Sequence, residues 1–582
     1  MSDLDHNQSK RPWVAPLVFA AAALVIGSIG INWGIPSMER NRLYLSLGQD
    51  APEVPREIVE KSWKHFPEFG WLGENKGPDN LQDKEGFKRS LFNPVRSYHP
   101  DEYVVFKTIA NMNPGRLDFD PEFYAWPSFF IYLVAMALKL CSLVGLAHLT
   151  TDIKHYFQHP EDMARLYIIG RGIVVLFGMA SAAVTYLIGK RLKGTRCGWI
   201  AAAVLVLSPA FVINIHYMTA DLPMMCFALL TILFCLHIVA NPSRRWYVLA
   251  GASAGLCAGM KYTGAVILFT LAYAHVLAWI GKKDVRHKWI ICSLLLAVAC
   301  FAIVNPFHIL HLSKVMQILS WESEYVYRSD AQTNWFLIPG RILLCGLGMT
   351  LPLVALVGLL RFTLTKHPPD LILVSGFLIY LATARVSSPF LRHYMILVPF
   401  AVLLASLLVA DLGGRLKTTR GGRRMAVVGC LVLVLPCVPK SWGLLSDFAS
   451  VNVRTRGGEF IAEHIERGAK IALVSEPWQF DCPPLDLQKY QIIVTGYDPQ
   501  RVMADKPDWF VGTSLQFETL YGFESASGNM KRFRDEVLRN EQIASRFSFQ
   551  GSMQRRHRRW PQDMRYVRPE VLIYRFHWTE GQ

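Results

Sequence analysis

The sequence predicts an α-helical polytopic membrane protein of about eleven transmembrane helices, followed by a small C-terminal α/β domain outside the membrane. Of the 582 residues, 52% are apolar and only 18% are charged, and the mean hydropathy is +0.24. A soluble chain of this length would carry about a quarter charged residues. The apolar residues also stand in long uninterrupted blocks. This pattern excludes a soluble enzyme, a disordered chain and a disulfide-rich secreted module.

Charge and cysteine content agree with this class. The 61 Lys and Arg residues outnumber the 45 Asp and Glu residues, for a formal net charge of +16. On a soluble chain such an excess would suggest nucleic acid, but on a membrane protein it reflects cytoplasmic loops and contact with anionic lipid head groups. All cysteines except Cys482 lie in apolar blocks, and no CxxC pair occurs. The cysteines are therefore expected to be small buried side chains rather than disulfides or metal ligands.

The predicted transmembrane helices are apolar blocks near the length of about 20 residues that a bilayer requires. The first block follows Lys10 and Arg11 and no small-residue cleavage site closes it, so we expect an uncleaved signal anchor after a cytoplasmic N-terminus at 1–12. The candidate spans are 13–33, 166–189, 197–217, 222–240, 246–260, 263–281, 289–304, 336–360, 370–385, 394–412 and 425–442.

The basic residues of the short loops predict the orientation, because such residues stay in the cytoplasm. Alternation from a cytoplasmic N-terminus places every basic cluster inside: Lys190, Arg191, Lys193 and Arg196; Arg244 and Arg245; Lys282, Lys283, Arg286 and Lys288; Arg361 and Lys366; Arg415, Lys417, Arg420, Arg423 and Arg424. The opposite loops carry only isolated cations: Lys261, Lys314, Arg328, Arg385 and Arg392. We therefore expect a multi-pass protein of the plasma or inner membrane.

One apolar block, 123–146, interrupts this alternation, since a single crossing there would move every later basic cluster outside. Its Pro127 and Lys139 suit an interfacial or re-entrant segment, or a short hairpin, on the outer side. The predicted parts are then an outer loop at 34–165, a bundle at 166–442 and an outer soluble domain at 443–582. In the last part IAEHIERG is typical of a helix, and KIALVS, QIIVTG and DWFVGTS are typical of strands.

The first polar motif is His99-Pro100-Asp101-Glu102-Tyr103, which opens the amphipathic stretch EYVVFKTIANM. Acidic residues after a proline suit the first turn of a helix, where the helix dipole favours negative charge. An equally weighted interpretation is a general base, since a carboxylate at the membrane surface could accept a proton from a reacting group.

Two further motifs place single ionisable residues between apolar runs, where they are costly in lipid and indicate a functional site. Asp221, in HYMTADLP, is either such a residue or the N-cap of the span that begins at Leu222, and both can hold together. Lys261, in GMKYTG, is either functional or a lysine that extends its side chain to the membrane interface.

The fourth motif, Pro389 to Tyr394, combines Arg392, His393 and Tyr394 at the mouth of a span. These side chains suit a phosphate or diphosphate, although interfacial anchoring is the simpler explanation. Asn305-Pro306-Phe307-His308 is a weaker motif that could simply end a helix. The basic run Arg555 to Arg559 could bind a lipid or glycan, or form a solvated surface.

Other chemistries find little support. The sequence has no P-loop, no GxGxxG opening a helix and no HExxH. The GASAG stretch from Gly251 to Gly255 matches GxSxG but lies within a predicted span rather than on a strand-turn-helix elbow. No nucleic-acid partner and no cofactor are expected. A divalent metal beside the carboxylates is compatible with the sequence but not required by it.

The ordered set of motifs resembles a known family. Along the chain come a first span, a large outer loop with the Asp101–Glu102 pair, the segment WPSFFIYL, an Asp at a span end, and the KYTG, NPF and RHYMILVPF motifs. Together they resemble the polytopic glycosyltransferases of the C superfamily (GT-C), specifically the protein O-mannosyltransferase and lipid A aminoarabinose transferase relatives, over roughly residues 10–440. The family usually has two prolines before the apolar segment, whereas this chain has Ala125-Trp126-Pro127-Ser128 and no lysine beside it.

This resemblance implies transfer of a sugar from a polyprenyl-phosphate donor to a protein, lipid or glycan hydroxyl, with the active site on the outer side. Asp101 would be the general base, and inversion is expected. The missing lysine shifts the expected phosphate site to Lys261, Arg392 and His393, while Glu102 and Asp221 would orient the acceptor or the cations. His99, Tyr262 and Tyr394 complete the predicted substrate-binding set. A membrane transporter or a non-catalytic envelope assembly protein remains the alternative.

Overall fold

The computed structural model describes residues 13–48, 53–63, 94–327, 337–383, 390–416, 419–517, 528–541, 544–549 and 560–578. The chain divides into two compact units. One contains Met1–Ile29, Phe123–Val134 and Arg171–Leu445, and the other contains Gly30–Glu122, Ala135–Gly170 and Ser446–Gln582. The predicted N-terminal segment 1–12, Pro389, Arg328, Arg385, Lys417 and the basic run at 555–559 lie outside the described residues.

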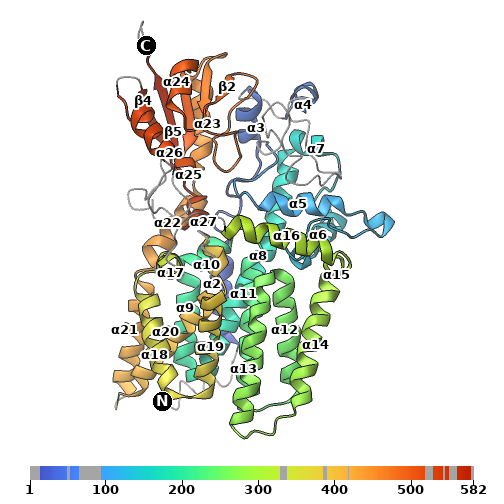
Figure 1. Ribbon diagram of the computed structural model, residues 1–582, viewed down its shortest axis with the longest axis vertical. Helices are drawn as coiled ribbons and strands as arrows, with labels where there is room; N and C mark the ends of the chain where they lie inside the picture. The colour runs from blue at the N-terminus through green and yellow to red at the C-terminus, as the bar shows by residue number, and fades with distance from the viewer. Residues whose placement is uncertain are drawn as a thin grey trace. The chain divides into compact units, whose positions relative to one another are not determined.

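The first unit is a helical bundle (Figure 1). Its helices are α2 Val14–Ser28, α9 Thr195–Leu207, α10 Pro209–Asn214, α11 Asp221–Ala240, α12 Arg244–Met260, η4 Tyr262–Val266, α13 Ile267–Ile280, α14 His287–Val304, α15 Pro306–Leu310, α16 Leu312–Tyr327, α17 Leu337–Leu347, α18 Thr350–Thr365, α19 Pro368–Thr383, η5 Leu391–Tyr394, α20 Leu397–Gly414 and α21 Thr419–Val434. Three helices, α6 Phe129–Leu143, α8 Pro160–Lys193 and α22 Val438–Ala449, contribute residues to both units.

The structure confirms a multi-pass helical membrane protein, although it does not test the count of about eleven helices. Five helices among the described residues are long and apolar enough to cross a membrane, or up to seven if each bent helix pair is one span. The predicted span at 336–360 is not one straight helix, because the chain bends by 120° between α17 and α18. Gly348 allows this turn with a φ of +75°, a backbone conformation that favours glycine.

The predicted span at 197–217 is also divided, for a reason visible in the sequence. Helix α9 ends before Ser208, whose hydroxyl accepts a hydrogen bond from the Phe211 amide at 3.3 Å. Pro209 then occupies the first turn of α10. A serine N-cap followed by proline is a strong signal for a new helix, and proline inside a helix would remove a backbone hydrogen bond.

The GASAG stretch is a surface for helix packing, which agrees with its exclusion as a nucleophile motif. Helix α12 lies beside α14 (Figure 1). A Cβ atom on Gly251 would come within 2.3 Å of the Ser293 carbonyl oxygen, and one on Gly255 within 2.3 Å of the Ala297 carbonyl oxygen. Small residues at such positions let two membrane helices approach closely.

The block at 123–146 forms one helix, α6 Phe129–Leu143, of 15 residues. The short-hairpin interpretation is therefore wrong. The helix is shorter than the spans above and exposes apolar side chains, Met136, Leu140 and Leu143 among them. An interfacial or re-entrant position stays a prediction.

The second unit contains the C-terminal α/β domain, which confirms that part of the predicted fold. Its helices are α3 Met38–Leu45, α4 Arg56–Trp63, α5 Glu102–Asn111, η3 Pro114–Arg116, α7 Ile153–Gln158, α23 Val453–His464, α24 Pro499–Asp505, α25 Ser514–Phe517, α26 Gly528–Phe533, η6 Arg534–Leu538 and α27 Gln562–Arg565. Its strands are β1 Lys470–Leu473, β2 Gln491–Val494, β3 Trp509–Thr513, β4 Ala544–Phe549 and β5 Val571–Phe576.

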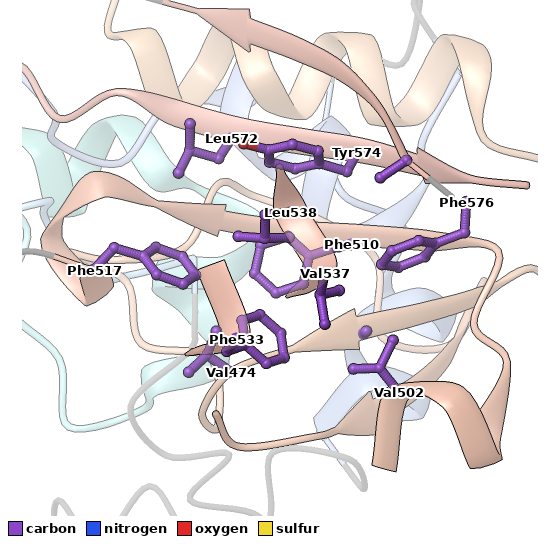
Figure 2. Close-up of a cluster of buried hydrophobic side chains, with 12 residues drawn as sticks. Val474, Val502, Phe510, Phe517, Phe533, Val537, Leu538, Leu572, Tyr574 and Phe576 are labelled. Carbon is purple, nitrogen blue, oxygen red and sulfur yellow. The ribbon is translucent and has the colours of Figure 1, made fainter. Parts of the chain in front are cut away.

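The strands form one mixed sheet in the order β2-β1-β3-β5-β4. β1 is parallel to β2 and β3, whereas β5 is antiparallel to β3 and β4. The first three strands are those that the sequence predicts, and the last two were not predicted. Apolar side chains from β1, β3 and β5 meet those of α24, α26 and η6 in a buried cluster around Phe510, Phe517 and Phe533 (Figure 2). This cluster covers one sheet face and is the core of the domain.

Candidate active site

The acidic motif lies at the start of helix α5. Asp101 occupies the N-cap position with helical backbone angles, and its side chain makes no capping hydrogen bond; Glu102 is the first helical residue. Asp101 is half-buried, whereas Glu102 is fully buried. A capping role through the Asp101 side chain therefore finds no support in the structure.

Glu102 is held inside the loop that precedes the helix. The Ser97 hydroxyl donates a hydrogen bond to Glu102 Oε2 at 2.6 Å. The Ser97 amide in turn donates to the Tyr167 hydroxyl at 3.0 Å, and that hydroxyl donates to the Val95 carbonyl at 3.1 Å. Glu102 thus anchors the loop, and its predicted role in orienting a substrate or cation stays a prediction.

His99 acts on the backbone of Asp101. The Asp101 amide donates a hydrogen bond to His99 Nδ1 at 3.2 Å. The imidazole is 1% exposed and packs edge-on against the ring of Tyr566, with ring centroids 5.4 Å apart and an interplanar angle of 85°. Tyr566 comes from the C-terminal domain and has no motif around it, so sequence reasoning missed it.

Buried arginines flank the same motif. Two guanidinium groups contact the ring of Tyr98, with Arg40 at 4.4 Å and Arg454 at 5.0 Å from its centroid. Arg40 also donates to the carbonyl oxygens of Gly34 and Arg96 at 2.7 Å each. These cation–π contacts and hydrogen bonds stabilise the backbone on the N-terminal side of Asp101.

Arg96, whose carbonyl oxygen accepts the hydrogen bond from Arg40, interacts electrostatically with Asp101, the candidate base. Burial lowers the pKa of Arg96, while the nearby Tyr103, Tyr167 and Asp101 oppose that change. Asp101 therefore lies within electrostatic range of a buried guanidinium group.

In the bundle unit, Lys261 and Asp221 form an ion pair. Lys261 Nζ lies 2.7 Å from Asp221 Oδ1, with the two side chains 20% and 4% exposed. Ala220, not Asp221, occupies the N-cap position of α11, so the N-cap interpretation of Asp221 is wrong. The ammonium group of Lys261 binds this buried carboxylate, and an interfacial position of Lys261 stays a prediction.

Arg392 and His393 join the neighbourhood of Lys261. Both lie in η5, just before α20, and the Arg392 guanidinium stacks 4.4 Å from the Phe390 ring centroid. His393 is exposed within its unit. Desolvation of its ring by the surrounding protein, together with the positive charges of Lys261 and Arg392, lowers the pKa of His393 well below its ordinary value.

Tyr394 and Tyr262 serve different purposes in this unit. Tyr394 is 1% exposed and lies inside the bundle. The Tyr262 hydroxyl donates a hydrogen bond to the Tyr124 carbonyl at 2.8 Å. Both residues were predicted to bind substrate, and that role stays a prediction.

The NPFH motif holds the segment before α6. Asn305 Oδ1 accepts a hydrogen bond from the Phe129 amide at 3.0 Å. His308 binds the Trp126 carbonyl at 2.9 Å and the Ser128 hydroxyl at 3.3 Å through its two ring nitrogens. The WPSFF, KYTG and NPFH motifs, far apart in sequence, therefore meet in the bundle unit, and NPFH does more than end a helix.

Within the described ranges, no group of three or more His, Cys, Asp or Glu side chains is arranged to hold a metal ion. The carboxylate of Asp221 is already paired with an ammonium group. The predicted compatibility with a divalent metal is not tested by this observation.

The fold defines a multi-pass helical membrane protein with charged groups at helix ends. Residues 169–307 match the model of the family described as dolichyl-phosphate-mannose-protein mannosyltransferase. Over that segment, the match agrees with the resemblance to GT-C membrane glycosyltransferases. The matched segment contains Asp221, Lys261 and Tyr262 but not Asp101 or Arg392. No curated protein sequence matches the chain.

Solved structures of membrane glycosyltransferases are distantly similar. ArnT from Cupriavidus metallidurans in the apo state is 12% identical, with 97% of this chain and 98% of that chain covered and a TM-score of 0.45. The Archaeoglobus fulgidus oligosaccharyltransferase is 12% identical, with 74% and 67% covered and a TM-score of 0.43. The arabinofuranosyltransferase AftD from Mycobacteria is 13% identical, with 76% and 35% covered and a TM-score of 0.34. At these TM-scores the likeness carries no conclusion about this chain.

Proposed function

We propose that the protein transfers a sugar from a polyprenyl-phosphate-linked donor to an acceptor hydroxyl on the outer side of the membrane. The observation that carries the proposal is the group of Lys261, Arg392 and His393, in which a partly buried ammonium is held by Asp221 at 2.7 Å. The family match supports the donor class, because the family's description names a dolichyl-phosphate-linked mannose. The acceptor is a protein, lipid or glycan hydroxyl.

The cations would bind the phosphate of the donor. A departing polyprenyl phosphate gains negative charge as its bond to the sugar breaks, and positioned cations stabilise that charge in the transition state. Asp221 would hold Lys261 in place. The lowered pKa of His393 favours its neutral form, and a bound phosphate would favour its protonated form.

Asp101 would accept the proton of the acceptor. The acceptor oxygen attacks the anomeric carbon, the carbon–oxygen bond to the phosphate breaks, and the bonding electron pair leaves with the phosphate. The acceptor's proton passes to the Asp101 carboxylate, so atoms and charge balance. A single displacement inverts the configuration at the anomeric carbon.

The first prediction tests this base. Asp101→Asn keeps the size and hydrogen-bonding reach of the side chain but removes its basicity, so turnover should fall by roughly 10²–10⁴. The measurement is transfer from a synthetic polyprenyl-phosphate sugar by the full-length protein reconstituted in vesicles. Asp118→Asn, an exposed acid in the same region of the chain, is the matched control and should keep full turnover.

Equal turnover of the Asp101→Asn variant and the wild type would contradict the assignment of Asp101 as the general base.

Lipid mass spectrometry of a strain that lacks the protein tests the transferase activity itself. Accumulation of a polyprenyl-phosphate sugar is the expected result and would name the donor. Unchanged donor levels, with no transfer by the reconstituted protein, would favour a transporter or a non-catalytic assembly protein.

A further inference from the structure

A second charged cluster of the bundle unit is centred on Asp411, near the C-terminal end of α20. Lys193 Nζ lies 3.0 Å from Asp411 Oδ1, and Arg361 donates to Oδ2 through Nη2 at 2.7 Å and Nε at 3.0 Å. Arg415 Nε lies 3.2 Å from the same oxygen. The cations come from α8, α18 and the residue that follows α20, so the fold brings three separate chain segments to one carboxylate.

The carboxylate lies beneath its cations. The side chain of Asp411 is 14% exposed, whereas those of Lys193, Arg361 and Arg415 are 46%, 28% and 60% exposed. One negative charge and three positive charges leave a net charge of +2. The nearby Asp370 is itself 3.3 Å from His367, and counting it still leaves the cluster positive.

Many hydrogen-bond donors in this cluster remain for another group. A guanidinium carries five N–H donors and an ammonium carries three. Asp411 accepts two hydrogen bonds from Arg361, one from Arg415 and one from Lys193. The remaining donors therefore suit an additional anion, and guanidinium groups match the geometry of a phosphate.

Exposed apolar side chains stand on the same helices as the cluster. Leu360 and Leu364 of α18 are 62% and 81% exposed, and Leu412 of α20 is 44% exposed. An ion in solution would not use these side chains, but the acyl chains of a lipid would. Charge and apolar surface together fit an anionic amphiphile.

We propose that Lys193, Arg361 and Arg415, organised by Asp411, bind the phosphate of an anionic phospholipid head group. This site is separate from the proposed donor site, because α20 begins at Leu397, just after Arg392 and His393, and Asp411 lies near its other end. The 14 residue steps from Leu397 to Asp411 extend over about 21 Å at 1.5 Å per residue. The proposal does not depend on the proposed transferase activity.

The test measures binding of phosphatidylglycerol, with phosphatidylcholine as the neutral reference, to the purified full-length protein by native mass spectrometry. The double variant R361Q/R415Q keeps Asp411 paired with Lys193 and should weaken phosphatidylglycerol binding about tenfold or more. The matched control is K282Q/K283Q, which removes the same charge from another predicted inner loop and should change binding less than about twofold.

Two further variants distinguish lipid binding by a specific arrangement of the cations from nonspecific attraction to positive charge. D411N makes the cluster more positive but removes the group that holds the cations together, so binding should weaken. R361K/R415K retains all charge but loses the planar guanidinium donors, so lipid binding should also weaken. If D411N does not fold, R361K/R415K still tests whether binding requires an organised site. The proposal is overturned if D411N strengthens binding, if K282Q/K283Q matches R361Q/R415Q, or if inorganic phosphate binds while the lipid does not.

Discussion

At the scale of single residues, the structure distinguishes roles that the sequence left open. An interfacial lysine was the simpler interpretation of Lys261, and the structure shows that it pairs with the buried Asp221 at 2.7 Å. Asp101 was equally interpretable as a helix cap, yet its side chain makes no capping hydrogen bond. These observations concern local contacts, and the catalytic and phosphate-binding roles of the two residues stay predictions.

The Lys261 assignment leads to a second prediction. Lys261→Met should weaken donor binding about tenfold or more, since each lost charge-assisted hydrogen bond to phosphate costs on the order of 1.5–3 kcal/mol. Donor titration of the full-length protein measures the effect.

The matched variant for Lys261→Met is the double change Lys261→Met/Asp221→Asn. The single change leaves a buried carboxylate unpaired, which is strongly destabilising, whereas the double change removes both charges. If Lys261 only neutralised Asp221, the double variant would bind donor as tightly as the wild type. Persistent weak binding in both variants supports the phosphate role.

A third prediction concerns Tyr566, whose ring supports His99 and, through it, the Asp101 backbone. Such an aromatic contact contributes about 0.5–1.5 kcal/mol. Tyr566→Ala should therefore lower kcat by about two- to tenfold while leaving the KM for donor unchanged. Tyr566→Phe retains the ring and should stay near wild-type kcat. A rise in donor KM with constant kcat would assign Tyr566 to donor binding instead.

At the scale of secondary structure elements, small residues determine how closely the bundle helices pack. Gly251 and Gly255 place α12 against the backbone of α14, and Ser208-Pro209 divides one predicted span into α9 and α10. The glycines of α12 and the Ser208-Pro209 pair are both visible in the sequence. The sequence does not show which neighbouring helix each small residue faces.

The fourth prediction follows from this packing. Gly255→Ala should lower the thermal unfolding midpoint of the detergent-solubilised protein, because the added Cβ would come within 2.3 Å of the Ala297 carbonyl oxygen. Overpacking of this kind typically costs about 1–3 kcal/mol. Gly172→Ala is the control: Gly172 also lies in a helix, α8, but a Cβ there meets nothing within 4 Å. A midpoint for Gly255→Ala equal to that of Gly172→Ala would contradict the close approach of α12 and α14.

At the scale of the whole molecule, the distribution of charge along the bundle helices agrees with the alternation that the loops predict. Lys193, Arg361 and Arg415, from three predicted inner loops, meet at one carboxylate. Arg244 and Lys261 stand at opposite ends of α12. The predicted inner cations thus lie near helix ends, and Lys261, a predicted outer cation, lies at the other end of α12 from Arg244. Which end faces which side of the membrane remains a prediction.

The fifth prediction tests that assignment. Cysteines introduced at Ser46 and Ser475, both exposed, should react with a membrane-impermeant reagent in intact cells. A cysteine at Lys283, in a predicted inner loop, should react only after the membrane is permeabilised. Protection of Ser46→Cys or Ser475→Cys in intact cells would reverse the predicted orientation of that segment.

The sequence by itself determined the class of protein, the apolar segments that form the bundle helices, three of the five strands and the identity of the charged residues. These features follow from local hydrophobic periodicity, turn residues and the cost of an ionisable group in lipid. Only the tertiary structure decided that Asp221 pairs with Lys261, that Tyr566 supports His99, that NPFH holds the segment before α6, and that 336–360 bends. Each of these depends on contacts between residues far apart in the chain, and local pattern carries no information about which distant side chain will lie beside a given residue.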